Sequence, residues 1–225
     1  CSSESSERGY GACLHQHKAG SVPAPSFMKR NEAITQEDIQ QHIARCAQLL
    51  RDAKYAVALT GAGLSTPSGI PDFRSADSGM WEDSHAMEAA SLYGFRKNPQ
   101  AFFDWFRPLA RLIVKAQPNA AHHALADLEN TGIIKAVITQ NIDMLHSQAG
   151  SCTLFEVHGH LREATCNQCS RQVTATGLLE AFVEQGVIQK CEICGGVLNP
   201  NVVLFGEEMP QQVLRDAQRA ASACE

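Results

Sequence analysis

A glycine-rich segment is the part of this sequence best suited to chemistry. It runs from Gly61 to Arg74 with the letters GAGLSTPSGIPDFR, and it directly follows an apolar segment, residues 55–60, with the composition of a buried strand. Glycine lets a phosphate approach backbone N–H groups, and a helix that starts nearby offers partial positive charge. The segment therefore predicts a pyrophosphate-binding turn. Its spacing is not GxGxxG, so an ordinary surface loop of Gly, Pro and Ser is the alternative.

A second polar cluster follows another apolar run. Residues 133–138, IIKAVI, are suited to a buried parallel strand, and the letters TQNID occupy positions 139–143. Ligands bind at the carboxyl ends of strands in open α/β sheets, so we expect the two clusters to face one crevice. Alternatively, Asn141 and Asp143 only cap a helix that Met144 and Leu145 begin.

Two CxxC pairs predict a metal site, and their members are Cys166, Cys169, Cys191 and Cys194. Four thiolates at such spacing can surround one zinc ion tetrahedrally. No ligand position stays open in that arrangement, so the pattern indicates a structural zinc rather than one that activates water. A redox-active CxxC is the competing interpretation, although that chemistry needs only one pair.

A histidine lies just before the first pair. His158 stands beside Gly159 and follows a short apolar run, residues 153–155. Histidine is the side-chain type best suited to act as a general base at neutral pH, here exposed at the end of a strand. An ordinary polar role is the alternative, because the chain has nine histidines.

Taken together, these blocks resemble the sirtuin family of NAD-dependent protein lysine deacylases. GAGLSTPSGIPDFR, TQNID, the HG pair with its two CxxC pairs, and VVLFGE at 202–207 occur in the family's order, and the resemblance extends from about residue 35 to residue 225. It implies NAD as co-substrate, an acyl-lysine protein or peptide as substrate, and a bound zinc ion. The acyl group would pass to ADP-ribose, and nicotinamide would be released.

The resemblance also implies roles for single residues. The catalytic residues would be His158, the general base, and Asn141. The NAD-binding residues would come from the first two blocks: Gly61, Ala62, Gly63, Ser65, Asp72, Phe73, Arg74, Gln140, Asn141, Ile142 and Asp143. The acyl-lysine peptide would pair with a later segment, through Val203, Phe205, Gly206 and Glu207.

The acyl preference can also be approached through the resemblance. Family members that prefer succinyl or malonyl groups carry a tyrosine and an arginine three residues apart in the helix that corresponds to residues 98–116. Phe106 and Leu109 occupy the matching positions here, with Arg107 and Arg111 nearby. We therefore expect acetyl or longer apolar acyl groups.

The fold class that we predict is α/β, a Rossmann-like parallel sheet with helices, incomplete in its C-terminal part, plus a small inserted zinc-ribbon module. The expected strands are residues 55–60, 133–139 and 202–205, and residues 119–129 have the pattern of an amphipathic helix. The expected division is a poorly ordered N-terminal extension (1–34), a Rossmann-like NAD-binding domain (35–160 and 200–225) and a zinc-binding module (161–199).

Two alternative functions stay open at this level. The family pattern continues with a strand that ends in Gly-Thr-Ser, which does not occur here, so the chain could be a truncated, catalytically incompetent fragment that keeps zinc and partner binding. A protein ADP-ribosyltransferase is a minor alternative, because it would use the same activated ribose.

Composition limits the remaining classes. The chain has 225 residues and a formal net charge of −5, which is not the pattern of a nucleic-acid-binding protein. No apolar stretch approaches the roughly 20 residues that span a membrane. Nine cysteines without the spacing of a disulfide framework favour a reducing compartment, so we expect a cytoplasmic protein without direct nucleic-acid or membrane binding.

Overall fold

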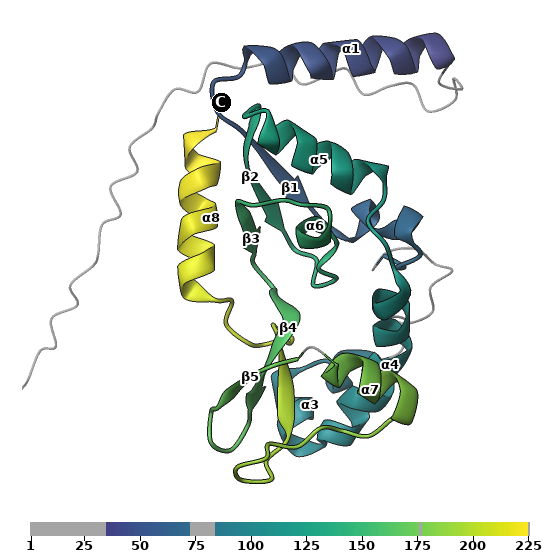
Figure 1. The fold of residues 1–225 in the computed structure, drawn as a ribbon, viewed down its shortest axis with the longest axis vertical. Helices are drawn as coiled ribbons and strands as arrows, with labels where there is room; N and C mark the ends of the chain where they lie inside the picture. Colours follow the sequence, from purple (N-terminus) through teal and green to yellow (C-terminus); the bar gives the residue numbers. More distant parts are fainter. Residues whose placement is uncertain (1–34, 73–83, 176, 225) are drawn as a thin grey trace, which may run out of the picture. The chain divides into compact units, whose positions relative to one another are not determined.

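A computed structural model describes residues 35–72, 84–175 and 177–224 (Figure 1). The described chain divides into two units, with the boundary between Gln41 and His42. Helix α1 (Gln36–Asp52) begins in the first unit, where the Thr35 hydroxyl accepts a hydrogen bond from the Asp38 N–H over 3.1 Å. The second unit contains both sheets. No helix in the described part of the chain is long and apolar enough to cross a membrane.

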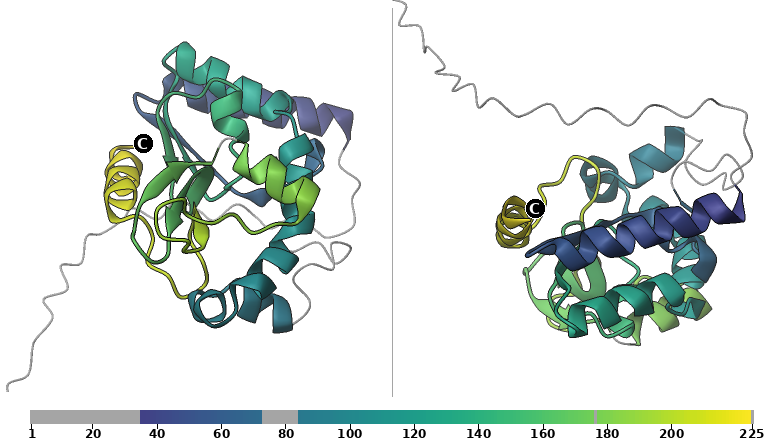
Figure 2. Two further views of the ribbon diagram at one scale, coloured as in Figure 1. Left: turned by 60° about the horizontal axis from the view of Figure 1, so that its bottom comes forward. Right: turned by 90° about the horizontal axis from the view of Figure 1, so that it is seen from above.

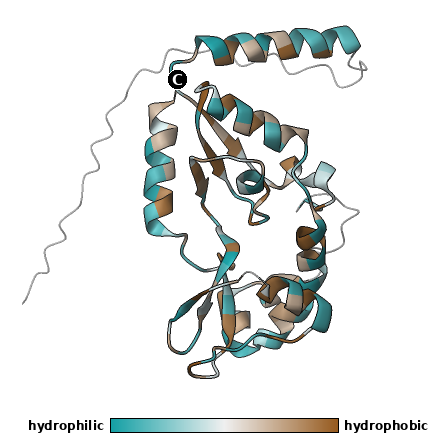
Figure 3. Cartoon of the chain, in the orientation of Figure 1, coloured by the Kyte–Doolittle hydropathy of each residue, from teal (hydrophilic) through white to brown (hydrophobic). Residues whose placement is uncertain are grey.

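The first sheet is parallel, as predicted. Its strands are β1 (Ala56–Thr60), β2 (Ile134–Thr139) and β3 (Leu154–Glu156), in the order β1-β2-β3. β2 is buried along most of its length, because it lies between two strands and its β-branched residues are covered on both faces. Figure 3 shows the hydrophobic character of β1 and β2.

Two helices cover this sheet, and the views of Figures 1 and 2 place the strands between them. Helix α5 (Ala120–Asn130), predicted from the sequence, packs on β2. Helix α8 (Gln211–Ala223) packs on β3 and buries Ala217 against Ile138. The short helix α6 (Leu145–Gln148) follows β2.

The second sheet is antiparallel and has the order β5-β4-β6. Its strands are β4 (Gly159–Cys166), β5 (Gln172–Thr174) and β6 (Leu198–Val202), and helix α7 (Leu178–Gln185) lies between β5 and β6 in sequence. The prediction of a strand at 202–205 was wrong, because the strand ends at Val202. The strand lies earlier in the sequence, because residues 198–202 pair antiparallel with β4, whereas the N–H groups of Val203 and Phe205 donate to His158 and Ala90.

A helical region completes the second unit and consists of α2 (Ser84–Ala89), α3 (Leu92–Lys97) and α4 (Pro99–Lys115). Asn98 caps α4 by accepting a hydrogen bond from the Ala101 N–H over 3.4 Å, and Pro99 suits the first turn because it lacks an N–H. Aromatic side chains of α4 form the centre of the main core. Phe106 stacks on Phe182 of α7 with ring centroids 6.5 Å apart, so α4 and α7 share this core.

Candidate active site

The polar segments predicted from the sequence begin where the parallel strands end. Thr60 closes β1 and Thr139 closes β2. The Gln140 N–H donates to the Thr60 carbonyl over 3.0 Å, and the Val157 N–H donates to the Thr139 carbonyl over 3.0 Å. Parallel strands that are paired in this way bring their carboxyl ends to one edge of the sheet. The glycine-rich segment, the TQNID block and His158 therefore lie at the same edge.

The glycine-rich segment folds as two short 3-10 turns, η1 (Ala62–Leu64) and η2 (Thr66–Ser68). η2 ends at Gly69, whose φ of +87° favours glycine. A different reason applies at Gly61 and Gly63: a Cβ on Gly61 would have its nearest neighbour at 4.0 Å, and one on Gly63 would meet nothing within 4 Å among the described residues. Packing in that part of the chain does not require glycine there, whereas close approach of a phosphate to the backbone would.

A buried hydrogen-bond network joins the glycine-rich segment to the TQNID block. The Ser65 hydroxyl, which is fully buried, donates to Asp143 Oδ2 over 2.6 Å. Asn141 Nδ2 donates to Ser65 Oγ and to the Gly61 carbonyl, each over 3.1 Å. Asp143 Oδ1 also accepts the Leu145 N–H over 2.9 Å at the start of α6. Asp143 therefore helps to begin a helix, as the alternative interpretation proposed, and it also holds the glycine-rich segment.

His158 lies in the connection between the two sheets. Its Nδ1 is 3.0 Å from the Gln140 carbonyl oxygen, which can only accept a hydrogen bond. Gly159 follows with a φ of +79°, and a Cβ there would collide with the carbonyl oxygen of Asn201. The Val203 N–H donates to the His158 carbonyl over 2.9 Å. The histidine backbone is thus fixed by a glycine turn against the end of β6.

The remaining NAD-binding residues predicted from the sequence differ in their burial, and two of them lie outside the described residues. Phe73 and Arg74 lie outside the described residues, and Asp72 is half-buried at their boundary. Ile142 is half-buried and packs against the main core, whereas the Gln140 side chain is exposed. Ala62 is half-buried in η1.

The segment predicted to bind peptide is bonded to two other parts of the chain and within itself. Its N–H groups donate to neighbours: Val203 to His158, and Phe205 to the Ala90 carbonyl over 3.0 Å. The Leu204 N–H donates to Glu207 Oε2, also over 3.0 Å. The Phe205 side chain is 43 % exposed. The segment therefore has a fixed backbone and presents an aromatic ring at the surface.

The four cysteines of the CxxC pairs converge in the antiparallel sheet. Their Sγ atoms all lie within 4.8 Å of one another, with Cys166 and Cys194 at 3.5 Å and Cys169 and Cys191 at 3.7 Å. Tetrahedral zinc with Zn–S bonds of about 2.3 Å separates its sulfurs by roughly 3.8 Å, so the cluster fits a zinc ion. Gly196 is required here, because a Cβ would lie 2.7 Å from Cys166 Sγ.

The electrostatic environment differs among these thiols. Backbone hydrogen bonds from Cys169 and Gln168 lower the pKa of the Cys166 thiol to about 6, and backbone hydrogen bonds at Ile193 and Cys194 lower the pKa of Cys191. The pKa of Cys194 is instead raised to about 12, because a backbone hydrogen bond from Gly196, which lowers it, is outweighed by the hydrogen bond with the Cys166 thiol and by burial. Lowered thiol pKa values also occur in redox CxxC pairs, so the convergence of four sulfurs, and not these pKa shifts, favours a metal site over a redox pair.

Three residues near the edge of the parallel sheet were not predicted as part of the site. Asn119 Nδ2 donates to the Leu64 carbonyl over 2.8 Å, within the glycine-rich segment. His122 and His146 are buried with ring centroids 4.9 Å apart, and burial lowers the pKa of both, that of His146 to about 4. Of these three residues, only Asn119 carried a signal in the sequence, because it stands at the start of the helix predicted at 119–129.

Comparison with known proteins agrees with this geometry. The model of the Sir2 family matches residues 61–225. The chain belongs to the Sir2 family. The resemblance seen in the sequence is thereby confirmed, together with the Rossmann-like fold.

Individual Sir2 relatives cover most of the chain. An NAD-dependent protein deacetylase of Thermodesulfovibrio yellowstonii is 42 % identical over 190 residues, which are 84 % of this chain and 74 % of the relative. An NAD-dependent protein deacylase 2 of Archaeoglobus fulgidus is 43 % identical over 188 residues, or 83 % and 73 % of the two chains.

Solved Sir2 structures give the same result. One described as "Structural Basis for the Mechanism and Regulation of Sir2 Enzymes" has a TM-score of 0.74 and 43 % identity, and covers 82 % of this chain and 73 % of that one. A Sir2–p53 peptide–NAD+ structure has a TM-score of 0.70 and 37 % identity, with 81 % and 72 % coverage.

Proposed function

We propose that this Sir2 protein is an NAD-dependent protein lysine deacylase. It would transfer the acyl group of a lysine side chain to ADP-ribose and release nicotinamide. The observation that carries the proposal is the common edge where the glycine-rich segment, Asn141 and His158 meet, held by the bonds from Ser65 to Asp143 and from His158 to Gln140. Relatives that are more than 40 % identical are named for this activity.

His158 would act as the general base. The Gln140 carbonyl accepts a hydrogen bond, so a neutral His158 that forms this bond carries its proton on Nδ1. Nε2 then keeps a lone pair that can remove a proton from a ribose hydroxyl. This proton transfer would follow attack of the acyl oxygen on the nicotinamide ribose and departure of nicotinamide.

NAD would be bound by both blocks at the edge. Gly61, Ala62, Gly63 and Ser65 would hold the pyrophosphate, because two open glycines let it reach backbone N–H groups. Asn141 and Gln140 would hold ribose hydroxyls. Ile142 and Asp143 would receive the carboxamide of nicotinamide, and Asp72, Phe73 and Arg74 would complete the site.

The acyl-lysine peptide would lie along residues 203–207, through Val203, Phe205, Gly206 and Glu207. Most N–H groups of this segment already donate within the chain. A peptide added as a strand would therefore rely on the segment's carbonyl groups and on the N–H of Gly206. The exposed ring of Phe205 supplies an apolar surface for the lysine stem.

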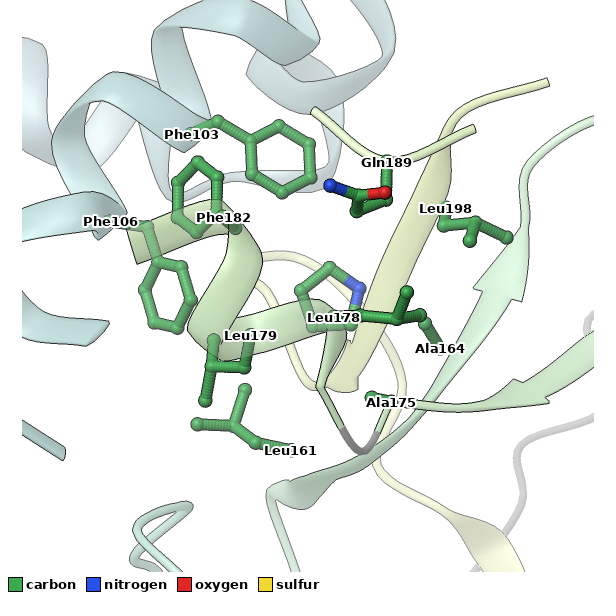
Figure 4. A pocket seen from close by; sticks show the side chains of 11 residues that line it. Phe103, Phe106, Leu161, Ala164, Ala175, Leu178, Leu179, Phe182, Gln189 and Leu198 are labelled. Atoms are coloured by element: carbon green, nitrogen blue, oxygen red, sulfur yellow. The ribbon is translucent and has the colours of Figure 1, made fainter. Parts of the chain in front are cut away.

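The acyl group would be uncharged. Phe106 and Leu161 line a small apolar cavity between α4, α7 and the antiparallel sheet, and Figure 4 shows the surrounding side chains. Arg107 does not supply a free cation, because its guanidinium donates to the Val183 carbonyl at 2.9 Å and the Glu184 carbonyl at 3.0 Å. These contacts support acetyl or longer apolar acyl groups over succinyl or malonyl groups.

Zinc would be held by the four cysteines as a structural ion. The described cysteines form no disulfide, and the metal site needs reduced thiols, which supports a cytoplasmic location. The domain limits, with residues 161–199 as the zinc-binding module, remain part of the proposal; the antiparallel sheet itself extends from Gly159 to Val202.

Mass spectrometry of the purified chain with NAD and an acetyl-lysine peptide tests the function. We expect free nicotinamide together with O-acetyl-ADP-ribose, and in His158→Ala loss of O-acetyl-ADP-ribose and of repeated nicotinamide release, with NAD binding retained. His123→Ala, at an exposed histidine of α5, is the matched control and should keep activity. A folded, zinc-loaded chain that forms neither product would be a catalytically incompetent fragment. ADP-ribose on protein without acyl transfer would instead indicate an ADP-ribosyltransferase.

A further inference from the structure

Asn119 connects helix α5 to the glycine-rich segment. Its side-chain amide donates two hydrogen bonds, to the Leu64 carbonyl over 2.8 Å and to Ser68 Oγ over 3.0 Å. These acceptors belong to different turns, because Leu64 ends η1 and Ser68 ends η2. A single side chain therefore sets the relative position of the two turns.

The position of Asn119 is itself fixed by the start of α5. Its Oδ1 accepts the Ala121 N–H over 2.9 Å, and its own N–H donates to His122 Nδ1 over 3.3 Å. His122 is fully buried, so it anchors this capping box in the core. Asn119 has little freedom to follow the glycine-rich segment if the segment moves.

The network of Ser65 and Asn141 holds only the first part of the segment. Its contacts reach Gly61 and Ser65. Beyond Ser65, the turn η2 is bonded locally, from the Thr66 hydroxyl to the Gly63 carbonyl over 3.0 Å and from Gly69 N–H to the Thr66 carbonyl. Ile70, just after the turn, is buried in the main core, but the bonds within η2 span only three residues and can open locally, whereas Asn119 holds Ser68 from a helix start 51 residues away in sequence.

We propose that Asn119 is a positioning residue for NAD, which holds the two turns of the glycine-rich segment in the geometry that receives the pyrophosphate. This inference rests on the proposed NAD-binding function. Asn119 does not need to touch NAD. By holding the segment in one geometry before NAD binds, Asn119 lowers the conformational entropy that the segment loses on binding.

Asn119→Ser separates this role from helix capping. Serine is a good N-cap and is uncharged, but it cannot make both bonds to Leu64 and Ser68. Asn98→Ser is the matched control, because Asn98 caps α4 and its side chain bonds to Ala101 rather than to the described part of the glycine-rich segment. We expect Asn119→Ser to raise the KM for NAD about tenfold, with kcat and the peptide KM within twofold of wild type. Asn98→Ser should change none of these constants.

Hydrogen exchange of the amides of Ser65 and Gly69 supplies a readout that needs no NAD. We expect both to exchange at least tenfold faster in Asn119→Ser and at the wild-type rate in Asn98→Ser. Unchanged exchange overturns the inference, and so does faster exchange with an unchanged KM for NAD. If the wild-type chain releases no nicotinamide and binds no NAD, the proposed function fails. A role for Asn119 in positioning NAD in this chain then fails with it. The exchange rates still show whether Asn119 holds the glycine-rich segment.

Discussion

The parallel sheet β1-β2-β3 buries apolar side chains between α5 and α8, whereas the antiparallel sheet β5-β4-β6 has a small core of its own in which two of the five buried residues are cysteines. The other three are Ala164, Ala175 and Leu198, which together offer little apolar area. The first sheet relies on burial alone, while the second joins the main core at one end through Leu161 and Val202 and carries the metal site at its other end. The comparison indicates that loss of zinc destabilises the zinc site, whereas the catalytic edge is destabilised by changes in the buried parallel sheet.

The largest expected effect comes from removing a zinc ligand. Cys166→Ser should abolish stoichiometric zinc and unfold the end of the antiparallel sheet that carries the cysteines, because structural zinc contributes on the order of 10 kcal/mol at pH 7. Zinc content and proteolysis of the region 159–202 measure this loss, and Cys152→Ser, at an exposed cysteine outside the cluster, is the control. Retained zinc in Cys166→Ser would contradict the four-cysteine site. Simultaneous loss of the parallel sheet would contradict the separation of the two regions.

The next effect concerns the junction of the two sheets. Gly159→Ala forces a side chain into the left-handed region and into the Asn201 carbonyl, so we expect a loss of about 3–5 kcal/mol in the free energy of unfolding and loss of turnover. Gly132→Ala has a similar φ of +74° with its nearest neighbour at 3.9 Å, and it should lose only about 1–2 kcal/mol. Urea unfolding compares the two variants. Equal losses would show that the contact at Asn201 is unimportant.

A pH-dependent effect is expected in the parallel region. Burial and then the neighbouring His122 lower the pKa of His146 to about 4, although Asp143 and Glu156 act in the opposite direction. The unfolded chain, with a histidine pKa near 6.5, then binds more protons, so stability should fall as the pH drops from 6.5 towards 4, by about 3 kcal/mol in total. His146→Gln should flatten this dependence in urea unfolding at pH 7.5 to 5, and His123→Gln should not. If the free energy of unfolding falls equally steeply with falling pH in His146→Gln and His123→Gln, His146 is not the cause.

The smallest effect on stability concerns the edge of the parallel sheet. Leu59 of β1 is 70 % exposed, and β1 pairs on one side only within the described chain. Leu59→Lys should change the free energy of unfolding by less than about 0.5 kcal/mol and reduce self-association, because a charged edge resists strand pairing. Sedimentation measures the association. A large loss of stability would mean that Leu59 is buried in solution.

Local pattern was enough to predict much of the fold. The runs at 55–60 and 133–139 became β1 and β2, and the helix expected at 119–129 became α5. The short spacing of each CxxC pair also constrains its own geometry, and the four Sγ atoms do converge. The strand expected at 202–205 was misplaced, because its apolar letters do not reveal that the pairing with β4 involves residues 198–202.

The sequence by itself determined the elements, the Sir2 blocks and the chemical types available at the catalytic edge, since these depend on spacing and side-chain chemistry over short distances. The tertiary structure alone decided that Asn119 holds two turns far away in the sequence, that Arg107 is bonded to α7, and that Asp143 both starts a helix and binds Ser65. The physical reason is that a hydrogen-bond partner is chosen among groups brought together by packing. A local pattern specifies the donor but not the acceptor that folding places beside it.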